Sequence, residues 1–395
     1  MKKGRKIKRY GNIYGRGLSS GSVVIIIAMV VGVLIFGFLG WVLYTPVSEF
    51  FQQLNTQDER DLQLDSVQNS SQGSGAVSQT SGSSEPPVIT PLDIEGFYIP
   101  ISLTIDNLLR DGSVQRAKNG SLNAVLVDAK DASGVVLFNS SNNVALSSNA
   151  VSETAFSAKE MADYVHSQGM VPAARLHAFR DSTAAFMNRE MAVSYYDTST
   201  TWLDNSLELG GKPWLNPYSS EAQKYISDLS IELAENGFEI IILDSVQFPS
   251  GVGTEKAGYG NAGGKTRNEA LLAFVENVSR QLEARGAQLV IAMPSGHIIT
   301  GDEAKDEYVK SKNDELFGGN PALYKNMLLT LSPGQGEAEA KQASLMSDIA
   351  KWMYLIPAYS ADGAVQDVSA TVARIDNIDQ LGYILYNPQG NYKLS

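Results

Sequence analysis

The chain of 395 residues contains no cysteine and only three histidines, His166, His177 and His297. The absence of cysteine excludes disulfides, thiol nucleophiles and zinc–thiolate sites. The histidines are not spaced as metal ligands, for example in a His-Glu-x-x-His motif. We therefore expect no metal and no organic cofactor. A Ca²⁺ site stays open, because oxygen ligands in acidic loops leave little trace in a sequence.

Basic residues are scarce beyond the first 16 positions. Residues 1–16 hold seven of the 31 Lys and Arg residues and no acidic residue. The other 24 basic residues stand against all 43 Asp and Glu residues, which gives the rest of the chain a net charge of −19. Such an acidic surface repels the phosphates that dominate nucleic-acid binding. We expect no nucleic-acid partner.

One long run without any charge extends from Ser22 to Tyr44. A helix of this length crosses a hydrocarbon core of about 30 Å. The run is longer than the apolar core of a cleaved signal peptide and lacks an Ala-x-Ala-like site. By the positive-inside rule, we expect residues 1–21 to be a basic cytoplasmic tail and residues 22–44 a transmembrane signal anchor. The protein is then a single-pass cell-membrane protein with its C-terminal part outside the cytoplasm.

Residues 45–92 contain few large apolar side chains, and residues 66–87 are rich in Ser, Gly and Gln. Such a segment cannot bury enough apolar surface to fold, so it predicts a flexible linker. From Asp93 onward the composition is that of a globular protein. Residues 93–395 are long enough for one large domain.

A repeated transition organises this domain: five times, a helix-like segment ends in glycine and continues into an apolar, strand-like segment. Glycine relieves the left-handed backbone that commonly ends a helix. The five glycines are Gly120, Gly169, Gly237, Gly286 and Gly382. Residues 96–99, 328–331 and 354–358 add three strands, and eight strands in this rhythm predict an α/β protein with a (β/α)8 TIM-type barrel. An open doubly wound sheet is the alternative, but no Gly-x-Gly-x-x-Gly turn follows the first strand.

The fourth predicted strand is the most informative, because an apolar run of Ile and Leu ends abruptly in Asp244. An uninterrupted apolar run is typical of a strand buried on both faces. A carboxylate at its C-terminal end opens onto the face where barrels place their active sites. The alternative interpretation of Asp244 is an acid that forms a turn or caps a helix.

Several segments of the domain carry a family resemblance. They are GFYIP (96–100), LNAVLVDAKDASG (122–134), GMVPAARLHAFRD (169–181), the long block 214–251 and LGYILYNPQGNY (381–392). They resemble the glycosyl-hydrolase domain of bacterial envelope proteins, a relative of the α-amylase-like (β/α)8 barrels. The resemblance implies a barrel that acts on polysaccharide, with Asp244 in the nucleophile position. The chain departs from the family pattern at Ser245 and Gln247, where Tyr and Arg are usual, and its fifth strand ends without an acid.

Glycoside hydrolysis requires two carboxylates on either side of the scissile bond. Asp244 is the first candidate, and Asp128 or Asp131, at the end of the second strand, is the favoured partner. The alternative for the segment around Asp128 and Lys130 is an internal ion-pair cluster that shapes the barrel mouth. Weaker candidates in later loops are Glu255, Asp302 and Glu303.

Arg175 and His177 end the third strand and share one face, since side chains two apart in a strand point the same way. Either can bind a sugar hydroxyl or neutralise Asp244; a structural salt bridge is the alternative for Arg175. Further predicted substrate-binding residues are Lys130, Gln247, Tyr359 and Asn387, and His297 is a weaker candidate. Sugar-stacking faces could come from Trp202, Trp214, Tyr218, Tyr259 and Tyr359, but aromatic residues at such positions more often pack in the core or in loops.

These observations leave three hypotheses. The leading one is a membrane-anchored hydrolase-type barrel whose partner is a cell-wall glycan or another envelope polysaccharide. The second is a barrel without catalytic activity that binds glycan or envelope proteins, and the third is a structural partner in an envelope assembly. The glycine-rich segment 258–266 lacks the spacing of a phosphate loop, so we expect it to form a rim or lid.

Overall fold

The computed structural model describes residues 94–294, 303–319, 326–331, 354–360, 366–367, 382–390 and 392–393, all within the unit Glu85–Ser395. None of the helices in these ranges has the length and apolar character needed to cross a bilayer. The predicted tail, anchor and linker lie outside the described residues. These three segments and the proposed domain boundary at residue 93 stay predictions.

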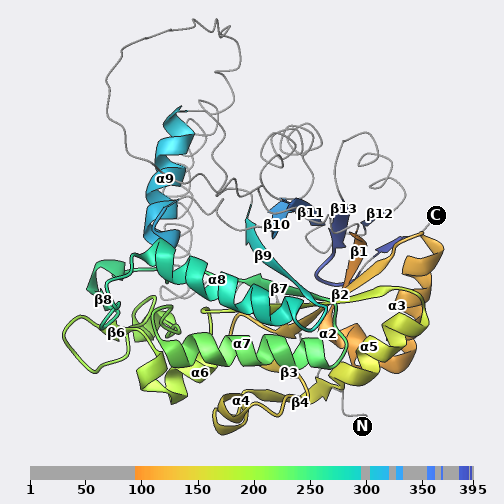
Figure 1. Ribbon diagram of the computed structural model, residues 1–395, viewed down its shortest axis with the longest axis horizontal. Helices are drawn as coiled ribbons and strands as arrows, with labels where there is room; N and C mark the ends of the chain where they lie inside the picture. Colours follow the sequence, from red (N-terminus) through yellow and green to blue (C-terminus); the bar gives the residue numbers. More distant parts are fainter. Residues whose placement is uncertain are drawn as a thin grey trace, which may run out of the picture. The chain divides into compact units, whose positions relative to one another are not determined.

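Eight parallel strands form the centre of the domain (Figure 1). They are β1 (Ile94–Ile99), β2 (Ala124–Lys130), β5 (Val171–His177), β7 (Ile240–Asp244), β9 (Gln288–Pro294), β10 (Asn326–Leu331), β11 (Tyr354–Ser360) and β13 (Gly382–Tyr386). Each strand pairs with the next in this order, and β13 pairs back with β1. The eight predicted strands are therefore all present, and this closed sheet is not the open alternative.

Helices lie between the strands and pack on the outside of the sheet (Figure 1). They are α2 (Ile101–Thr104), α3 (Asn107–Asn119), α5 (Ala158–Ser167), α7 (Ser220–Glu235), α8 (Arg267–Glu283) and α9 (Glu303–Phe317). Most begin at a residue whose side chain accepts a hydrogen bond from the first turn, such as Asp106, Ser157, Ser219 and Thr266. Such capping satisfies backbone N–H groups that have no partner inside the helix.

Smaller elements decorate the barrel. After β2 come β3 (Val136–Phe138), α4 (Asn143–Ser147) and β4 (Val151–Phe156), of which β3 pairs antiparallel with β2. After β5 come α6 (Ser182–Met187) and β6 (Ser194–Tyr195), and β8 (Ala257–Gly258) follows β7. Short 3₁₀ helices lie at Arg189–Met191, Leu207–Leu209 and Thr254–Lys256. The strands β12 (Gln366–Asp367) and β14 (Tyr392–Lys393) pair with each other.

Two hydrophobic layers explain why the strands read as uninterrupted apolar runs. On β7, Ile240 and Ile242 belong to the cluster inside the barrel, whereas Ile241 and Leu243 pack with the helices outside. The same alternation holds on β2, where Leu126 is on the inside. Both faces of β2 and β7 are thus buried, as is usual for a parallel barrel.

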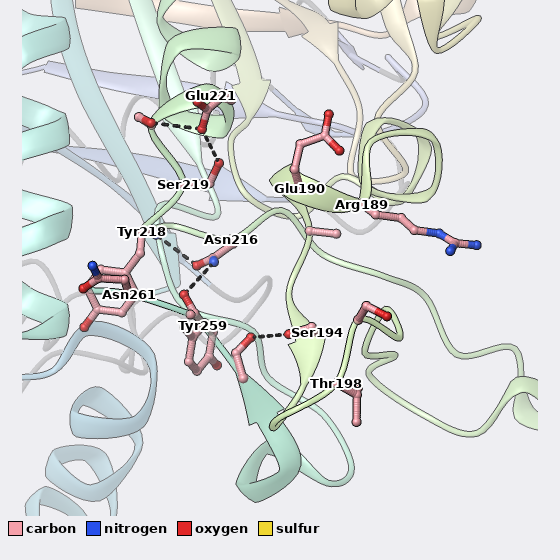
Figure 2. A pocket seen from close by; sticks show the side chains of 15 residues that line it. Arg189, Glu190, Ser194, Thr198, Asn216, Tyr218, Ser219, Glu221, Tyr259 and Asn261 are labelled. Atoms are coloured by element: carbon pink, nitrogen blue, oxygen red, sulfur yellow. Dashed lines mark hydrogen bonds between the residues drawn. The ribbon is translucent and has the colours of Figure 1, made fainter. Parts of the chain in front are cut away.

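The loops after β5 and β7 form a layer of their own. Strands β6 and β8 pair, and the Ser194 hydroxyl donates to the carbonyl of Gly258 (Figure 2). Trp202 and Trp214 are buried beside Val193 in a small hydrophobic cluster. The Trp202 Nε1 donates to the Gly253 carbonyl at 3.0 Å, which ties the two loops together. Protein atoms bury both side chains, as expected for ordinary packing.

Two tyrosines with opposite hydrogen bonding give a matched pair of stability predictions. The buried Tyr225 hydroxyl has no hydrogen-bond partner among the described residues. By contrast, the Tyr392 hydroxyl lies within 3.1 Å of the carbonyls of Tyr98 and Leu385 and accepts from the amide of Asn387. An unmade buried hydrogen bond costs about 1–3 kcal/mol, and a made one contributes about 1 kcal/mol. Tyr225→Phe should therefore raise the free energy of unfolding, and Tyr392→Phe should lower it.

Urea unfolding of the two variants beside the wild type measures both changes. The urea midpoint should be highest for Tyr225→Phe, intermediate for the wild type and lowest for Tyr392→Phe. A lower midpoint for Tyr225→Phe than for Tyr392→Phe would contradict the hydrogen-bond assignment.

Candidate active site

The carboxyl ends of five barrel strands bring a polar group together inside the barrel mouth. Residues two apart on a strand share a face, so the inward set on β7 continues from Ile240 and Ile242 to Asp244. The same count on the other strands gives inward polar positions above the apolar interior. They are Tyr98, Asp128, Arg175, His177, Asp244 and Tyr386.

Asp128 is held from two sides in this mouth. Its Oδ1 accepts from the Arg175 Nε at 2.7 Å, and its Oδ2 accepts from the Tyr98 hydroxyl at 2.6 Å. Arg175 also donates to the Tyr386 hydroxyl at 2.7 Å. Burial lowers the pKa of Arg175, but Asp128 and Tyr386 outweigh it and raise this pKa above its usual value. Arg175 therefore stays charged, and both oxygens of Asp128 are occupied.

Asp244 is held from one side only. Its Oδ1 accepts from the Ser245 hydroxyl at 3.1 Å and lies 3.6 Å from the His177 Nδ1. No described residue donates to its other oxygen, and a quarter of the Asp244 side chain is exposed, against 17 % for Asp128. Asp244 is thus the carboxylate with an oxygen open to the mouth.

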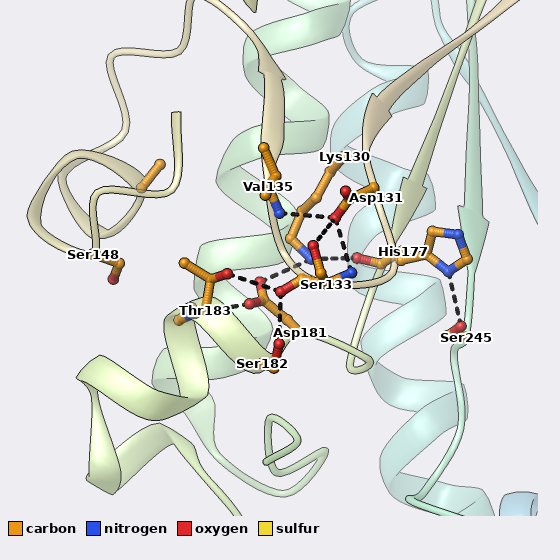
Figure 3. A network of polar contacts seen from close by, with 12 residues as sticks. Lys130, Asp131, Ser133, Val135, Ser148, His177, Asp181, Ser182, Thr183 and Ser245 are labelled. Carbon is orange, nitrogen blue, oxygen red and sulfur yellow. Dashed lines mark hydrogen bonds and ion pairs between the residues drawn. The ribbon is translucent and has the colours of Figure 1, made fainter. Parts of the chain in front are cut away.

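Ser245 links Asp244 to His177. The Ser245 hydroxyl lies 3.0 Å from the His177 Nδ1 (Figure 3). Because it donates its single proton to Asp244, it accepts from His177, so Nδ1 carries the proton of the neutral ring. The Nε2 of His177 is then left as an acceptor. Ser245 has a φ of 55°, a left-handed conformation that is uncommon for a residue other than glycine and is often found at functional sites.

The chain can now be compared with known proteins. A family model described as "Putative glycosyl hydrolase domain" matches residues 96–304, which is more than half of the chain.

The chain belongs to this family.

Solved structures with a similar fold include a hypothetical protein from Ruminiclostridium thermocellum, with 24 % identity over 49 % of this chain and 96 % of that one and a TM-score of 0.44. The Flavobacterium johnsoniae chitobiase has 12 % identity over 75 % of this chain and 45 % of its own, with a TM-score of 0.43. The glycoside hydrolase domain of PelA from Pseudomonas aeruginosa has 12 % identity over 77 % and 97 %, with a TM-score of 0.40. The chain spans less than half of the chitobiase. No curated protein matches it.

Lys130, a predicted substrate-binding residue, does not point into the barrel with the other mouth residues. A bulge lies between Asp128 and Lys130, so Lys130 pairs with Leu176, an outward position, instead of continuing the inward set. Its side chain is completely buried, forms an ion pair with Asp181 at 2.8 Å and donates to the His177 carbonyl at 2.6 Å (Figure 3). In this arrangement the ammonium of Lys130 is engaged with Asp181 and the His177 carbonyl, and its role in substrate binding stays a prediction.

Asp131, the second predicted partner carboxylate, lies in the turn after β2. Its Oδ1 accepts from the amides of Ser133 and Val135 and from the Ser133 hydroxyl (Figure 3). One oxygen of Asp131 thus stabilises a turn, while Asp128 stands in the mouth itself. Asp128 thus shares the inward side of the barrel with Asp244, and the catalytic role of Asp128 and Asp131 stays a prediction.

Asn387, another predicted substrate-binding residue, directly follows β13. Its side chain is fully buried, and its Oδ1 accepts from the amide of Gln389 at 3.0 Å, as in a turn. It therefore shapes the segment after β13, and its role in substrate binding stays a prediction. Gln247 follows β7 and is half-buried, so its predicted role stays open. Tyr359 is on β11, opposite Leu331 and Leu385, and its side chain lies outside the described residues.

The weaker candidates are less informative. Glu255 lies in the exposed 3₁₀ helix after β7. Asp302 and His297 lie outside the described residues, as does the side chain of Glu303. Four polar residues of the site were missed by the sequence analysis: Tyr98, Ser245, Asp181 and Tyr386. Counting inward positions along each strand would have found Tyr98 and Tyr386, because both share a face with apolar residues of the interior. No comparable sequence signal marks Ser245 or Asp181.

His177 gives a prediction for the pH dependence of stability. Burial lowers its pKa below the usual 6.5, Asp244 and Asp128 oppose this, and Arg175 and Lys130 add to it. Between this lowered pKa and 6.5, the histidine therefore binds more protons in the unfolded chain than in the folded protein. The resulting stabilisation is complete above pH 6.5 and is lost as the pH falls through the lowered pKa.

We therefore expect the free energy of unfolding of the wild type to fall more steeply between about pH 7 and pH 5 than that of His177→Gln. Urea unfolding of both proteins at the two pH values measures the difference. Equal slopes for the two proteins would contradict a lowered pKa of His177.

Proposed function

We propose that this protein is a membrane-anchored glycoside hydrolase that acts on a cell-envelope polysaccharide outside the cytoplasm. One observation carries the proposal: Asp244, at the inward carboxyl end of a barrel strand, keeps one oxygen open to the mouth. Membership of a glycosyl-hydrolase family supports the reaction class. Barrel enzymes place catalytic groups at this end of their strands.

Asp244 has the position for a nucleophile or a general base. As a nucleophile its open oxygen would bond to the anomeric carbon while the glycosidic C–O bond breaks, and the leaving oxygen would take a proton from an acid. Water would then release the sugar and restore the carboxylate. As a base, Asp244 would instead take a proton from the attacking water. Ser245 donates to the other oxygen and accepts from His177, and this chain of hydrogen bonds orients the carboxylate.

Asp128 supports a second candidate function, a barrel that binds glycan without cleaving it. The general acid must carry a proton and hand it to the leaving oxygen. Both oxygens of Asp128 already accept hydrogen bonds, from Arg175 and Tyr98, so Asp128 is placed as a hydrogen-bond acceptor. If no other carboxylate enters the mouth, the arrangement suits sugar recognition by Arg175, Tyr98 and Tyr386.

Product release separates the two functions. The full chain, purified in detergent, is incubated with a panel of envelope polysaccharides, and new reducing ends and soluble fragments are measured beside the amount of glycan bound. Fragment release from at least one polysaccharide is the expected result. Binding without any release over the whole panel would favour the second function, and neither binding nor release would contradict both.

The location is a separate part of the proposal and rests on the sequence. The uncharged run at residues 22–44 and the basic residues before it support an anchor with the barrel outside. Protease added to intact cells should then remove the barrel domain and leave the anchor in the membrane. Protection of the barrel until the membrane is dissolved would contradict this orientation.

A further inference from the structure

A second cavity lies in the loop layer, apart from the mouth residues described above. It has a volume of about 530 Å³ and lies between the loop after β5 and the loop after β7 (Figure 2). Its wall includes Glu190, Ser199, Tyr218, Glu221, Tyr259 and Asn261. The mouth residues Asp128, Arg175, His177 and Asp244 are not part of this wall.

The cavity is held in shape by its own contacts. Asn216 donates from its amide to the Tyr259 carbonyl at 3.0 Å, and its side-chain oxygen accepts from the amide of Tyr218. This one side chain thus joins the two loops that form opposite walls (Figure 2). The pairing of β6 with β8 and the bond from Trp202 to Gly253 add two more connections. A site held in this way loses little conformational entropy when it binds a ligand.

Aromatic rings form part of the cavity wall. Tyr218 and Tyr259 are half-buried, and both pack edge-on against Phe248, at centroid distances of 5.0 and 5.2 Å. The guanidinium of Arg267 lies over the Tyr259 ring, 5.3 Å from its centroid. Burial raises the pKa of Tyr259 to about 12, so its hydroxyl stays protonated. An amphipathic ring that is supported on one side suits an amphipathic ligand.

Free polar groups complete the wall. In the part of the chain that the structure describes, the side chains of Arg189, Glu190 and Ser199 have no hydrogen-bond partner, and neither does the Tyr259 hydroxyl. The cavity therefore presents both donors and acceptors beside aromatic surface. A polyhydroxylated ligand needs all three kinds of contact.

An anionic ligand is disfavoured at the same place. The N-terminus of α7 lies at the cavity, and such a helix end commonly attracts anions. Here the carboxylate of Glu221 already occupies the helix end. Glu221 accepts from the hydroxyls of Ser219 and Ser220. Its own backbone amide and these two hydroxyls lower the pKa of Glu221. With Glu190 also present, a phosphate or carboxylate ligand would meet two negative charges, against the single positive charge of Arg189.

We propose that this cavity is a second saccharide site, which binds a neutral sugar unit of a glycan at a distance from the mouth. The inference rests on the proposed function in its substrate class, but it requires no catalysis. An enzyme that binds one polymer at two sites gains avidity without any change in its catalytic groups. The second site would keep a long glycan on the barrel while the mouth acts on it.

The test fills the cavity without touching the mouth. Ser199→Trp adds bulk from the loop after β5, Asn261→Trp adds it from the loop after β7, and Thr200→Trp is the control. Thr200 is an exposed neighbour of Ser199 that is not part of the wall. Binding of neutral glucose and N-acetylglucosamine oligosaccharides and of anionic polygalacturonate to the full chain is measured by calorimetry, and release from short oligosaccharides is measured in parallel.

We expect at least tenfold weaker binding of a neutral oligosaccharide in Ser199→Trp and Asn261→Trp, wild-type binding in Thr200→Trp, and unchanged turnover of short substrates in all three. Wild-type binding in both filled variants, an equal loss in Thr200→Trp, or preferential binding of polygalacturonate would overturn the second site. If the wild type shows no turnover but the filled variants still lose binding, the hydrolase assignment fails and the second site stands. If the wild type releases fragments but the filled variants bind oligosaccharide as tightly as the wild type, the second site fails and the hydrolase assignment stands.

Discussion

Asp244→Asn should lower the rate of fragment release by on the order of 10⁴-fold, as removal of a catalytic group does in other hydrolases. The amide keeps the size and the hydrogen bond to Ser245 but cannot attack carbon or take a proton from water. Because Asn preserves the shape of the mouth, glycan affinity should change by less than the rate. The measurement is a comparison of kcat and KM on the polysaccharide that the wild type cleaves best.

Two variants frame this result. Asp228→Asn changes a carboxylate on α7 that pairs with Lys224 at the surface, and it should leave turnover unchanged. Asp128→Asn tests the partner: a loss comparable to that of Asp244→Asn would assign Asp128 a catalytic role. Turnover of Asp244→Asn within threefold of the wild type would remove Asp244 from the reaction.

Lys130→Met should destabilise the folded protein by about 3–5 kcal/mol, the cost of leaving one partner of a buried ion pair uncompensated. Lys130 and Asp181 are both completely buried, and Asp181 also accepts from the amide of Ala184 at the start of α6. Removal of the ammonium would leave the Asp181 carboxylate without a counter-charge. It would also leave the His177 carbonyl without its donor and so loosen the group that orients Asp244.

Urea unfolding of Lys130→Met, Asp181→Asn and the double variant measures the coupling between the two residues. The double variant should lose clearly less than the sum of the single losses, because neither charge is left alone. Lys224→Met is the surface control: its pair with Asp228 is exposed, and the expected change is below about 1 kcal/mol. A loss for Lys130→Met no larger than for this control would contradict a buried ion pair.

The barrel could be predicted from the sequence because its signals are local. Glycine at the end of a helix-like segment, followed by an apolar run, marks five of the eight strands. Burial of both strand faces removes the alternation seen in half-exposed sheets. Asp244, Arg175 and His177 could be placed in the mouth because strand periodicity fixes their side relative to apolar neighbours.

What could not be predicted depends on contacts between distant segments. Lys130 is two residues after Asp128, the spacing of residues that share a strand face, but a bulge reverses its direction. Its partner Asp181 is 51 positions further along the sequence, so nothing local signals the pair. Trp202 and Trp214 are of a residue type that can stack on sugars, but the pairing of two loops buries them. The second cavity exists only because the same two loops meet.

A structure of the Asp244→Asn variant of the full chain, crystallised with an oligosaccharide of the glycan it recognises, tests the central claim most directly. The account predicts a sugar ring in the barrel mouth, with its anomeric carbon next to the side chain at position 244 and its hydroxyls within reach of His177 and Arg175. An oligosaccharide bound only elsewhere on the protein, with the mouth empty, would contradict the assignment of Asp244 as the reactive carboxylate.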